Sequence, residues 1–177
     1  MLTDRLRREG HDALSLKYPV YDIAPSGPFL NQVLRGAEGA QKISEEELQL
    51  WFTVNRFQFQ PTLEQYLRDG KIVIAEDYVG TGVAWGSTKG ADEAWLETLN
   101  APLLKSDFSI FLKGERSLRA EEDSHLHENN HDLAARVAAT LDRLSKQHGW
   151  HVIEVREKKE ETAEVIYSAV KNFLMAA

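Results

Sequence analysis

Lys71-Ile-Val-Ile-Ala-Glu-Asp-Tyr-Val-Gly-Thr-Gly-Val-Ala-Trp-Gly86 is the stretch that decides the fold class of this 177-residue chain. It opens with a nearly continuous apolar run, which predicts a strand buried on both faces of a parallel sheet. Two carboxylates follow, and then Gly-Thr-Gly enters a predicted helix. Ligands of open parallel sheets bind beyond the carboxyl ends of the strands, and backbone N–H groups at a helix start can hold a phosphate. We therefore expect a ligand site here; the alternative is an acidic strand end with a helix cap.

The alternation of apolar runs and amphipathic stretches continues on both sides of this segment. Further strands are predicted at residues 14–18, 107–112 and 150–155. Helices are predicted at residues 2–9, within 25–36, and at 44–69, 92–100, 129–147 and 159–175. Strands separated by helices of this length imply right-handed crossovers. We predict an α/β fold of three layers, a parallel sheet with helices on both faces. The chain opens in a helix without the strand that a βαβ unit needs before it, so we expect an N-terminally truncated fold.

Composition and charge narrow the classes of function. The length suits one domain covering residues 1–177. A formal net charge of −7 argues against broad binding of DNA or RNA. No run approaches the roughly eighteen consecutive apolar residues of a membrane-spanning helix. The sequence contains no cysteine, which rules out disulfides and thiolate metal sites and fits a cytoplasmic protein.

Several motifs match one enzyme family in the family's own order. Val73-Ile-Ala-Glu-Asp-Tyr78 and Thr81-Gly-Val-Ala-Trp85 resemble an apolar strand ending in Asp-Arg-Tyr, followed by a serine-bearing turn and an aromatic residue on a helix. Trp51-Phe-Thr-Val-Asn-Arg56 resembles a helical Phe-x-x-x-Arg motif. Shorter likenesses are Tyr18-Pro19, Ser26-Gly27, Lys105-Ser-Asp-Phe-Ser-Ile-Phe-Leu112 and Gly149-Trp-His-Val-Ile-Glu154. In combination, the chain resembles the thymidylate kinase family, of the P-loop nucleoside monophosphate kinase class, over nearly its whole length.

The resemblance implies an activity and a set of site residues. The activity is ATP-dependent phosphorylation of thymidine monophosphate to the diphosphate with Mg²⁺, by a homodimer. Phe52 would stack on the thymine ring and Arg56 would hydrogen-bond its edge, since residues four apart share one face of a helix. Glu76 would replace the family's aspartate as the catalytic or magnesium-binding carboxylate. The remaining implied substrate-binding residues are Tyr18, Asp77, Tyr78, Thr81, Gly82 and Trp85.

Other readings of these residues stay open. Phe52 and Trp85 could instead be aromatic residues of the core, and Arg56 could pair with a neighbouring carboxylate. A segment at about 114–130 resembles the family's lid, with Arg116 and Arg119 as candidate ATP-binding residues.

Three departures from the family pattern bear on activity. The phosphate-cradling string Gly-x-x-x-x-Gly-Lys-Ser/Thr is missing from the sequence, and residues 120–130 contain no Lys or Arg. Asp77 stands where the family has the arginine that meets the acceptor phosphate, and a carboxylate there would repel a phosphate. We therefore do not expect thymidylate phosphorylation by this chain alone. One alternative is a deoxynucleoside kinase-like acceptor site with Glu76 as general base; another is a non-catalytic nucleotide-binding or dimerising relative.

Two motifs point elsewhere. His127-Glu-Asn-Asn-His131 matches H-E-x-x-H, in which the two histidines bind zinc and Glu128 polarises water, so a zinc hydrolase is a remote alternative. Its flanks are mostly charged and not apolar, which favours a polar helix start. Gly80-Thr-Gly-Val-Ala-Trp-Gly86 loosely resembles a dinucleotide-binding fingerprint, but its spacing is off by one.

Overall fold

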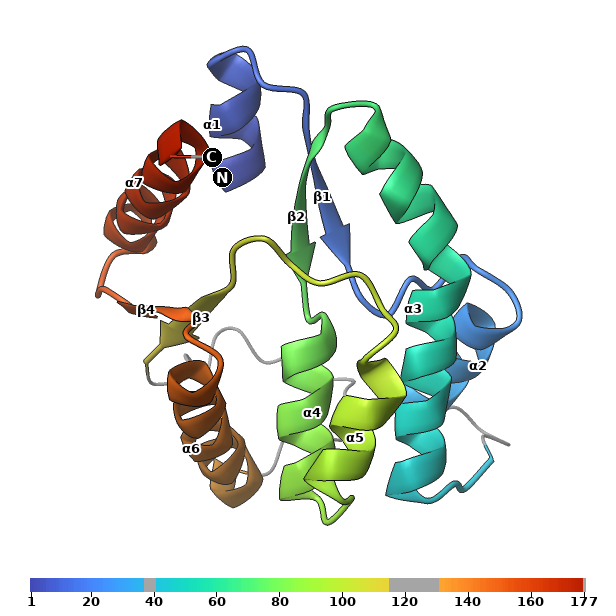
Figure 1. Ribbon diagram of the computed structural model, residues 1–177. Coiled ribbons are helices and arrows are strands. Elements are labelled where there is room, and N and C mark those ends of the chain that lie inside the picture. The colour runs from blue at the N-terminus through green and yellow to red at the C-terminus, as the bar shows by residue number, and fades with distance from the viewer. Residues whose placement is uncertain (37–40, 115–130, 177) are drawn as a thin grey trace.

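The computed structural model describes residues 1–36, 41–114 and 131–176 and has the predicted α/β architecture (Figure 1). In chain order its elements are α1 (Leu2–Arg8), β1 (Ala13–Lys17), α2 (Ser26–Leu34), α3 (Glu45–Arg68), β2 (Ile72–Glu76), α4 (Val79–Thr88), α5 (Glu93–Asn100), β3 (Ile110–Lys113), α6 (His131–Gln147), β4 (His151–Glu154) and α7 (Lys159–Ala176). All predicted helices and strands are present. The largest shift is in β3, which begins at Ile110 and not at residue 107.

Local sequence signals set several of these boundaries. Ser44 is the N-cap of α3, and its Oγ accepts a hydrogen bond from the N–H of Glu47 at 3.2 Å. Asp92 caps α5 in the same way through the N–H of Trp95, at 2.7 Å. Gly70 follows the end of α3 with a φ of +78°, a conformation that glycine adopts without steric cost. Each signal acts within one helical turn, which is why the sequence alone places it.

Among the described residues, the strands form two parallel pairs, β1–β2 and β3–β4, with no ladder between the pairs. In the first ladder Ala13 lies opposite Ile72, and Lys17 lies opposite Glu76. The apolar run of β2 is expected to be buried on both faces. It is only half-buried over its first three residues and exposed at Ala75 and Glu76. In the described ranges β2 has a hydrogen-bonded neighbour, β1, along one edge only, which leaves the strand partly exposed.

Helices cover both faces of the β1–β2 pair, as predicted. On one face Ile72 packs in a cluster with Leu6 of α1 and Val170 of α7. On the other face Leu16 packs against Leu63 of α3. In Figure 1 these two strands accordingly lie between α1 and α7 on one side and α3 on the other.

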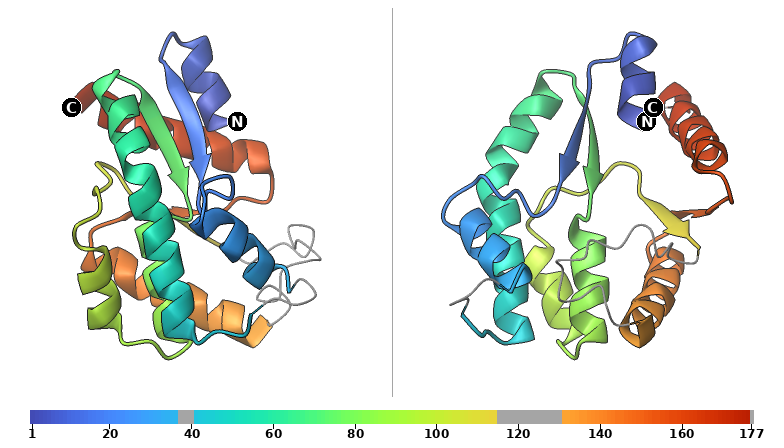
Figure 2. Two further views of the ribbon diagram at one scale, coloured as in Figure 1. Left: turned by 90° about the vertical axis from the view of Figure 1, so that its right-hand side faces the viewer. Right: turned by 180° about the vertical axis from the view of Figure 1, so that it is seen from behind.

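A third apolar cluster joins α4, α5 and α6 beyond the carboxyl ends of β1 and β2 (Figures 1 and 2). Its centre includes Val83, Leu96, Val137 and Leu144. This cluster packs α4 against α5 and α6. In the described ranges, no helix is long and apolar enough to cross a membrane.

Leu96 tests the importance of this third cluster. Its side chain is 0% exposed, so Leu96→Ala should lower the free energy of unfolding by about 2–5 kcal/mol through lost burial and the cavity left behind. Leu67→Ala is the matched control, since Leu67 lies on a helix but is 37% exposed, and it should cost less than about 1 kcal/mol. Both values come from urea titrations followed by circular dichroism. Equal losses would mean that the α4–α6 cluster does not hold the fold together.

Candidate functional site

Arg56, in the middle of α3, is the only charged side chain that is buried in the described part of the chain, with 3% of its surface exposed. Its Nη1 donates to Oδ1 of Asn100 at 3.1 Å, and its Nη2 donates to the carbonyl oxygen of Tyr78 at 3.2 Å. Its Nε is buried and has no hydrogen-bond partner among the described residues. A guanidinium has five N–H donors, so the described residues leave part of this donor capacity unused.

The surroundings of Arg56 disfavour its charged form. Burial lowers the pKa of Arg56 to about 10, and the electrostatic effects of Tyr78, Tyr18 and Asp77 oppose that shift only in part. The two acceptors named above, an amide oxygen and a backbone carbonyl, are both neutral. A buried cation held by neutral acceptors costs folding free energy. This cost makes Arg56 a candidate for donating hydrogen bonds to a ligand.

Phe52 and the first turn of α4 border this guanidinium. Phe52 lies one turn before Arg56 on α3, and its ring centroid is 6.0 Å from Cζ of Arg56. The expectation that these two side chains share one face of the helix is therefore confirmed. Gly82 packs directly on the guanidinium, because a Cβ added there would lie 2.6 Å from Nη2. Only glycine lets α4 approach α3 so closely.

The end of β2 contributes two exposed carboxylates and one inward tyrosine. Glu76 is exposed, and its carbonyl accepts from the N–H of Tyr18 at 3.0 Å. Asp77 has a φ of 56°, the only positive φ of a non-glycine residue in the described ranges, and aspartate tolerates this left-handed conformation better than most residues. Tyr78 is the N-cap of α4, and its hydroxyl donates to the carbonyl of Leu104 at 2.9 Å. The carboxyl end of β2 therefore carries two exposed acidic residues, Glu76 and Asp77, followed by the half-buried Tyr78.

Tyr18 lies beside Tyr78 in this interior. The two ring centroids are 5.0 Å apart, and burial raises the pKa of both phenols. The Tyr18 hydroxyl is buried and has no hydrogen-bond partner among the described residues. Tyr18 therefore packs against Tyr78. A contact between Tyr18 and a substrate stays a prediction.

The sequence reasoning overlooked two asparagines that organise the site. Asn55 clamps the loop after β1: its Oδ1 accepts from the N–H of Val20 at 2.8 Å, and its Nδ2 donates to the Val20 carbonyl and to Ser26 Oγ, both at 2.9 Å. Asn100, at the end of α5, orients Arg56 and also accepts from Thr53 Oγ1 at 3.4 Å. The sequence does show polar residues among apolar ones on the helix predicted at 44–69. No local pattern, however, indicates which distant groups they bond.

Two predicted substrate-binding residues lie further along α4. Thr81 is half-buried in the first turn of the helix. Trp85 is half-buried, packs against the α4–α6 cluster and has its ring centroid 5.9 Å from Nζ of Lys89. Their contacts with a substrate stay predictions, and the packing of Trp85 also agrees with the core interpretation.

Several sequence-based candidates fall outside the described residues. They are Arg116 and Arg119, nearly all of the lid-like segment at 114–130, and His127 and Glu128 of the H-E-x-x-H string. Its second histidine, His131, begins α6. Among the residues that the structure does describe, no group of three or more His, Asp or Glu side chains could hold a metal ion.

The described residues do not build a cradle for the β- and γ-phosphates of ATP. Such a cradle is made by a glycine-rich loop with its lysine, and a loop hydroxyl with a strand-end aspartate holds the Mg²⁺. The sequence has no such loop, and Glu76 is an exposed carboxylate outside any cluster of metal ligands in the described ranges.

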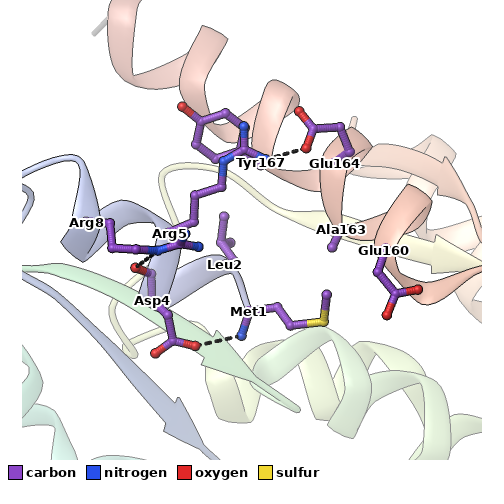
Figure 3. A pocket seen from close by; sticks show the side chains of 9 residues that line it. All are labelled: Met1, Leu2, Asp4, Arg5, Arg8, Glu160, Ala163, Glu164 and Tyr167. Atoms are coloured by element: carbon purple, nitrogen blue, oxygen red, sulfur yellow. Dashed lines mark hydrogen bonds and ion pairs between the residues drawn. The ribbon is translucent and has the colours of Figure 1, made fainter.

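A cavity of about 340 Å³ lies elsewhere, between α1 and α7 (Figure 3). Two ion pairs lie in its lining: the N-terminal amine with Asp4, and Arg5 with Glu164. Arg5 also lies over the ring of Tyr167, with Cζ 3.4 Å from the centroid. None of the predicted site residues lines this cavity, so we assign it to the packing of the two helices.

Comparisons with known proteins agree on one family. The family model described as "Thymidylate kinase" matches residues 1–166. The chain is 24% identical to the thymidylate kinase of Danio rerio over 181 aligned residues, which cover 99% of this chain and 84% of that protein. It is 25% identical to the thymidylate kinase of Arabidopsis thaliana over 73% of this chain and 49% of that protein. The chain spans about half the length of several curated relatives that it matches.

A solved structure gives the same answer for the fold. The thymidylate kinase of Candida albicans superposes with a TM-score of 0.76 at 17% identity, covering 97% of this chain and 84% of that one. At this identity the likeness establishes the shared P-loop kinase fold. Together with the family model, which covers nearly the whole sequence, it identifies the chain as a member of the thymidylate kinase family.

Proposed function

We propose that the Arg56 site binds the base of thymidine monophosphate, and that the chain serves the phosphorylation of this nucleotide to the diphosphate with ATP as donor and Mg²⁺ as cofactor. The observation that carries the proposal is the buried guanidinium of Arg56, which keeps an unpartnered Nε within the described residues. A neutral base carbonyl suits such a donor, because it accepts hydrogen bonds without bringing a second charge into the buried site. Phe52, on the same helix face, supplies an aromatic surface for stacking.

The acceptor phosphate raises a question of charge. Asp77 is close enough to Arg56 to influence the pKa of Arg56. In the proposed arrangement, the exposed Asp77 lies on the side from which the acceptor phosphate would approach. Like charges about 4–6 Å apart in a partly shielded crevice repel by on the order of 1–3 kcal/mol. This observation favours a second candidate, phosphorylation of a free deoxynucleoside hydroxyl with the exposed Glu76 as general base. In either case Glu76 is the proposed catalytic or metal-side carboxylate.

A homodimer is part of the proposal. Leu50, Val54 and Phe57 are 42%, 40% and 41% exposed, and together with the exposed Pro61 they follow the spacing i, i+4, i+7 and i+11 along α3. This forms one apolar stripe, which we call the α3 stripe, on the side of the helix opposite Arg56. A two-fold axis would bring the same stripe of a second copy against it, as an isologous interface requires. A cytoplasmic location, which the cysteine-free sequence favours, completes the proposal.

Arg56→Met should separate binding from folding. Thymidine should bind at least about tenfold more weakly, the loss of one charge-assisted hydrogen bond. Burial lowers the pKa of Arg56 to about 10, so the folded protein disfavours the charged guanidinium, and the free energy of unfolding should stay level or rise by ~1 kcal/mol. Calorimetry measures the affinity for thymidine, and urea titration measures the free energy of unfolding. Arg68→Met, on the exposed end of the same helix, should change neither. A stability loss above ~3 kcal/mol would instead make Arg56 a structural residue.

Asp77→Arg should distinguish the two acceptors. Removal of the carboxylate and addition of a phosphate-binding fork should tighten thymidine monophosphate binding at least tenfold, while thymidine binding changes little. Asp77→Asn keeps a residue that tolerates the left-handed backbone and should give an intermediate gain. Both affinities are measured by calorimetry. If nucleotide and nucleoside respond equally, residue 77 does not face the acceptor phosphate and the placement of the pocket is wrong.

Val54→Lys should disrupt the homodimer. A lysine in the centre of the α3 stripe would place two like charges across the two-fold axis, so the dissociation constant should rise at least a hundredfold, about 3 kcal/mol. Sedimentation equilibrium measures this. Leu67→Lys changes a similarly exposed residue of α3 outside the stripe and should leave the dimer intact. A wild-type protein that is monomeric at about 50 μM, or an equal effect of both substitutions, would reject the interface.

A further inference from the structure

Two of the buried polar side-chain atoms that lack a hydrogen-bond partner among the described residues belong to the Arg56 site. They are the hydroxyl of Tyr18 and Nε of Arg56. The exposed fractions of these side chains are 2% and 3%, so bulk water does not replace the missing partners. The third such atom, Oε1 of Glu97, lies 3.4 Å from the imidazole of His148. A buried polar group without a hydrogen bond costs folding free energy, so the first two atoms need an explanation.

Both of these atoms belong to side chains that contact Tyr78. The ring centroids of Tyr18 and Tyr78 are 5.0 Å apart, and Nη2 of Arg56 donates to the Tyr78 carbonyl at 3.2 Å. Tyr18 and Arg56 are close enough to influence each other's pKa. The Tyr78 hydroxyl gives its proton to the carbonyl of Leu104, so that proton is not available to Tyr18. The remaining neighbours of Tyr18 in its cluster are apolar side chains, including Phe59.

The two groups differ in the partner that each requires. A guanidinium N–H can only donate, so Nε of Arg56 needs an acceptor. A phenol can donate or accept, and burial raises the pKa of Tyr18, which keeps the phenol protonated and neutral. One ligand edge satisfies both groups if it presents an acceptor to Arg56 and a neighbouring polar atom to Tyr18. A neutral edge is favoured, because it brings no further charge into the buried site.

We propose that Tyr18 is a specificity-determining residue whose hydroxyl accepts a hydrogen bond from the ring N–H of a pyrimidine, while the carbonyl beside that N–H accepts from Arg56. This inference rests on the proposed function, because it places the base at Arg56. Thymine and uracil have an N–H and a carbonyl side by side, whereas cytosine presents an amino group where Arg56 needs an acceptor. The ligand class is therefore pyrimidines with an imide edge. A ligand without the ring N–H leaves the Tyr18 hydroxyl unpaired, which disfavours its binding.

Tyr18→Phe tests this role, because it removes the hydroxyl and keeps the ring. In calorimetry thymidine should bind about tenfold more weakly, the loss of one hydrogen bond. The free energy of unfolding of the unliganded chain, from urea titration, should not fall, since an unpartnered buried hydroxyl is removed. Tyr66→Phe is the matched control: Tyr66 also contacts the ring of Phe59, at 6.4 Å between centroids, and its substitution should change neither value. A loss of stability in Tyr18→Phe, or an unchanged affinity for thymidine, would overturn the inference.

A second ligand, N3-methylthymidine, locates the contact on the base. The ratio of its dissociation constant to that of thymidine measures recognition of the ring N–H. This ratio should fall at least tenfold in Tyr18→Phe and stay unchanged in Arg56→Met, where both ligands lose the same contact. An equal ratio in wild type and Tyr18→Phe would show that the hydroxyl does not face the ring N–H.

Arg56→Met also separates this inference from the proposed function. If Arg56→Met weakens thymidine binding and Tyr18→Phe does not, the role of Tyr18 is wrong and the base site at Arg56 stands. If Arg56→Met binds thymidine as tightly as the wild-type chain, the proposed function is wrong and the role of Tyr18 is rejected with it.

Discussion

The burial of polar side chains along α3 is the constraint on which the rest of this structure depends. Arg56 cannot leave water without acceptors, and it finds them in Asn100 and the backbone of Tyr78. Those bonds fix the end of α5 and the start of α4 against the middle of α3. Gly82 suits this contact, because a Cβ there would force the guanidinium to shift from its hydrogen-bonded position. The same helix holds the loop after β1 through Asn55. The geometry of the site therefore rests on one set of hydrogen bonds.

Charge divides the site into two parts with different consequences. The interior holds one cation whose pKa is lowered by burial, surrounded by aromatic rings and neutral acceptors. The mouth carries the exposed carboxylates of Glu76 and Asp77. An uncharged base suits the interior, because it satisfies donors without adding charge. In the proposed function, a phosphate near Asp77 would meet repulsion. Recognition of the base and recognition of the phosphate would then be physically separable.

In the described strands, side-chain packing joins β2 and β3, whereas backbone hydrogen bonding does not. The side chains of β2 and β3 meet in one cluster with α1 and α7, which holds the two strand pairs in a fixed arrangement. Their backbones form separate ladders. A strand with one paired edge keeps polar groups exposed beside an apolar cluster, which explains why the strongly apolar β2 is only half-buried.

The sequence by itself determined what depends on near neighbours: the α/β order of elements, the caps at Ser44 and Asp92, and the shared helix face of Phe52 and Arg56. Caps and helix faces involve residues within one or two turns, so their geometry follows from spacing. Only the tertiary structure decided that Asn55 holds Val20, that Asn100 holds Arg56, and that the strands form two pairs. Those partners are 35 and 44 residues apart in sequence. A hydrogen bond over such a separation depends on how whole helices pack, which no local pattern of residue types records.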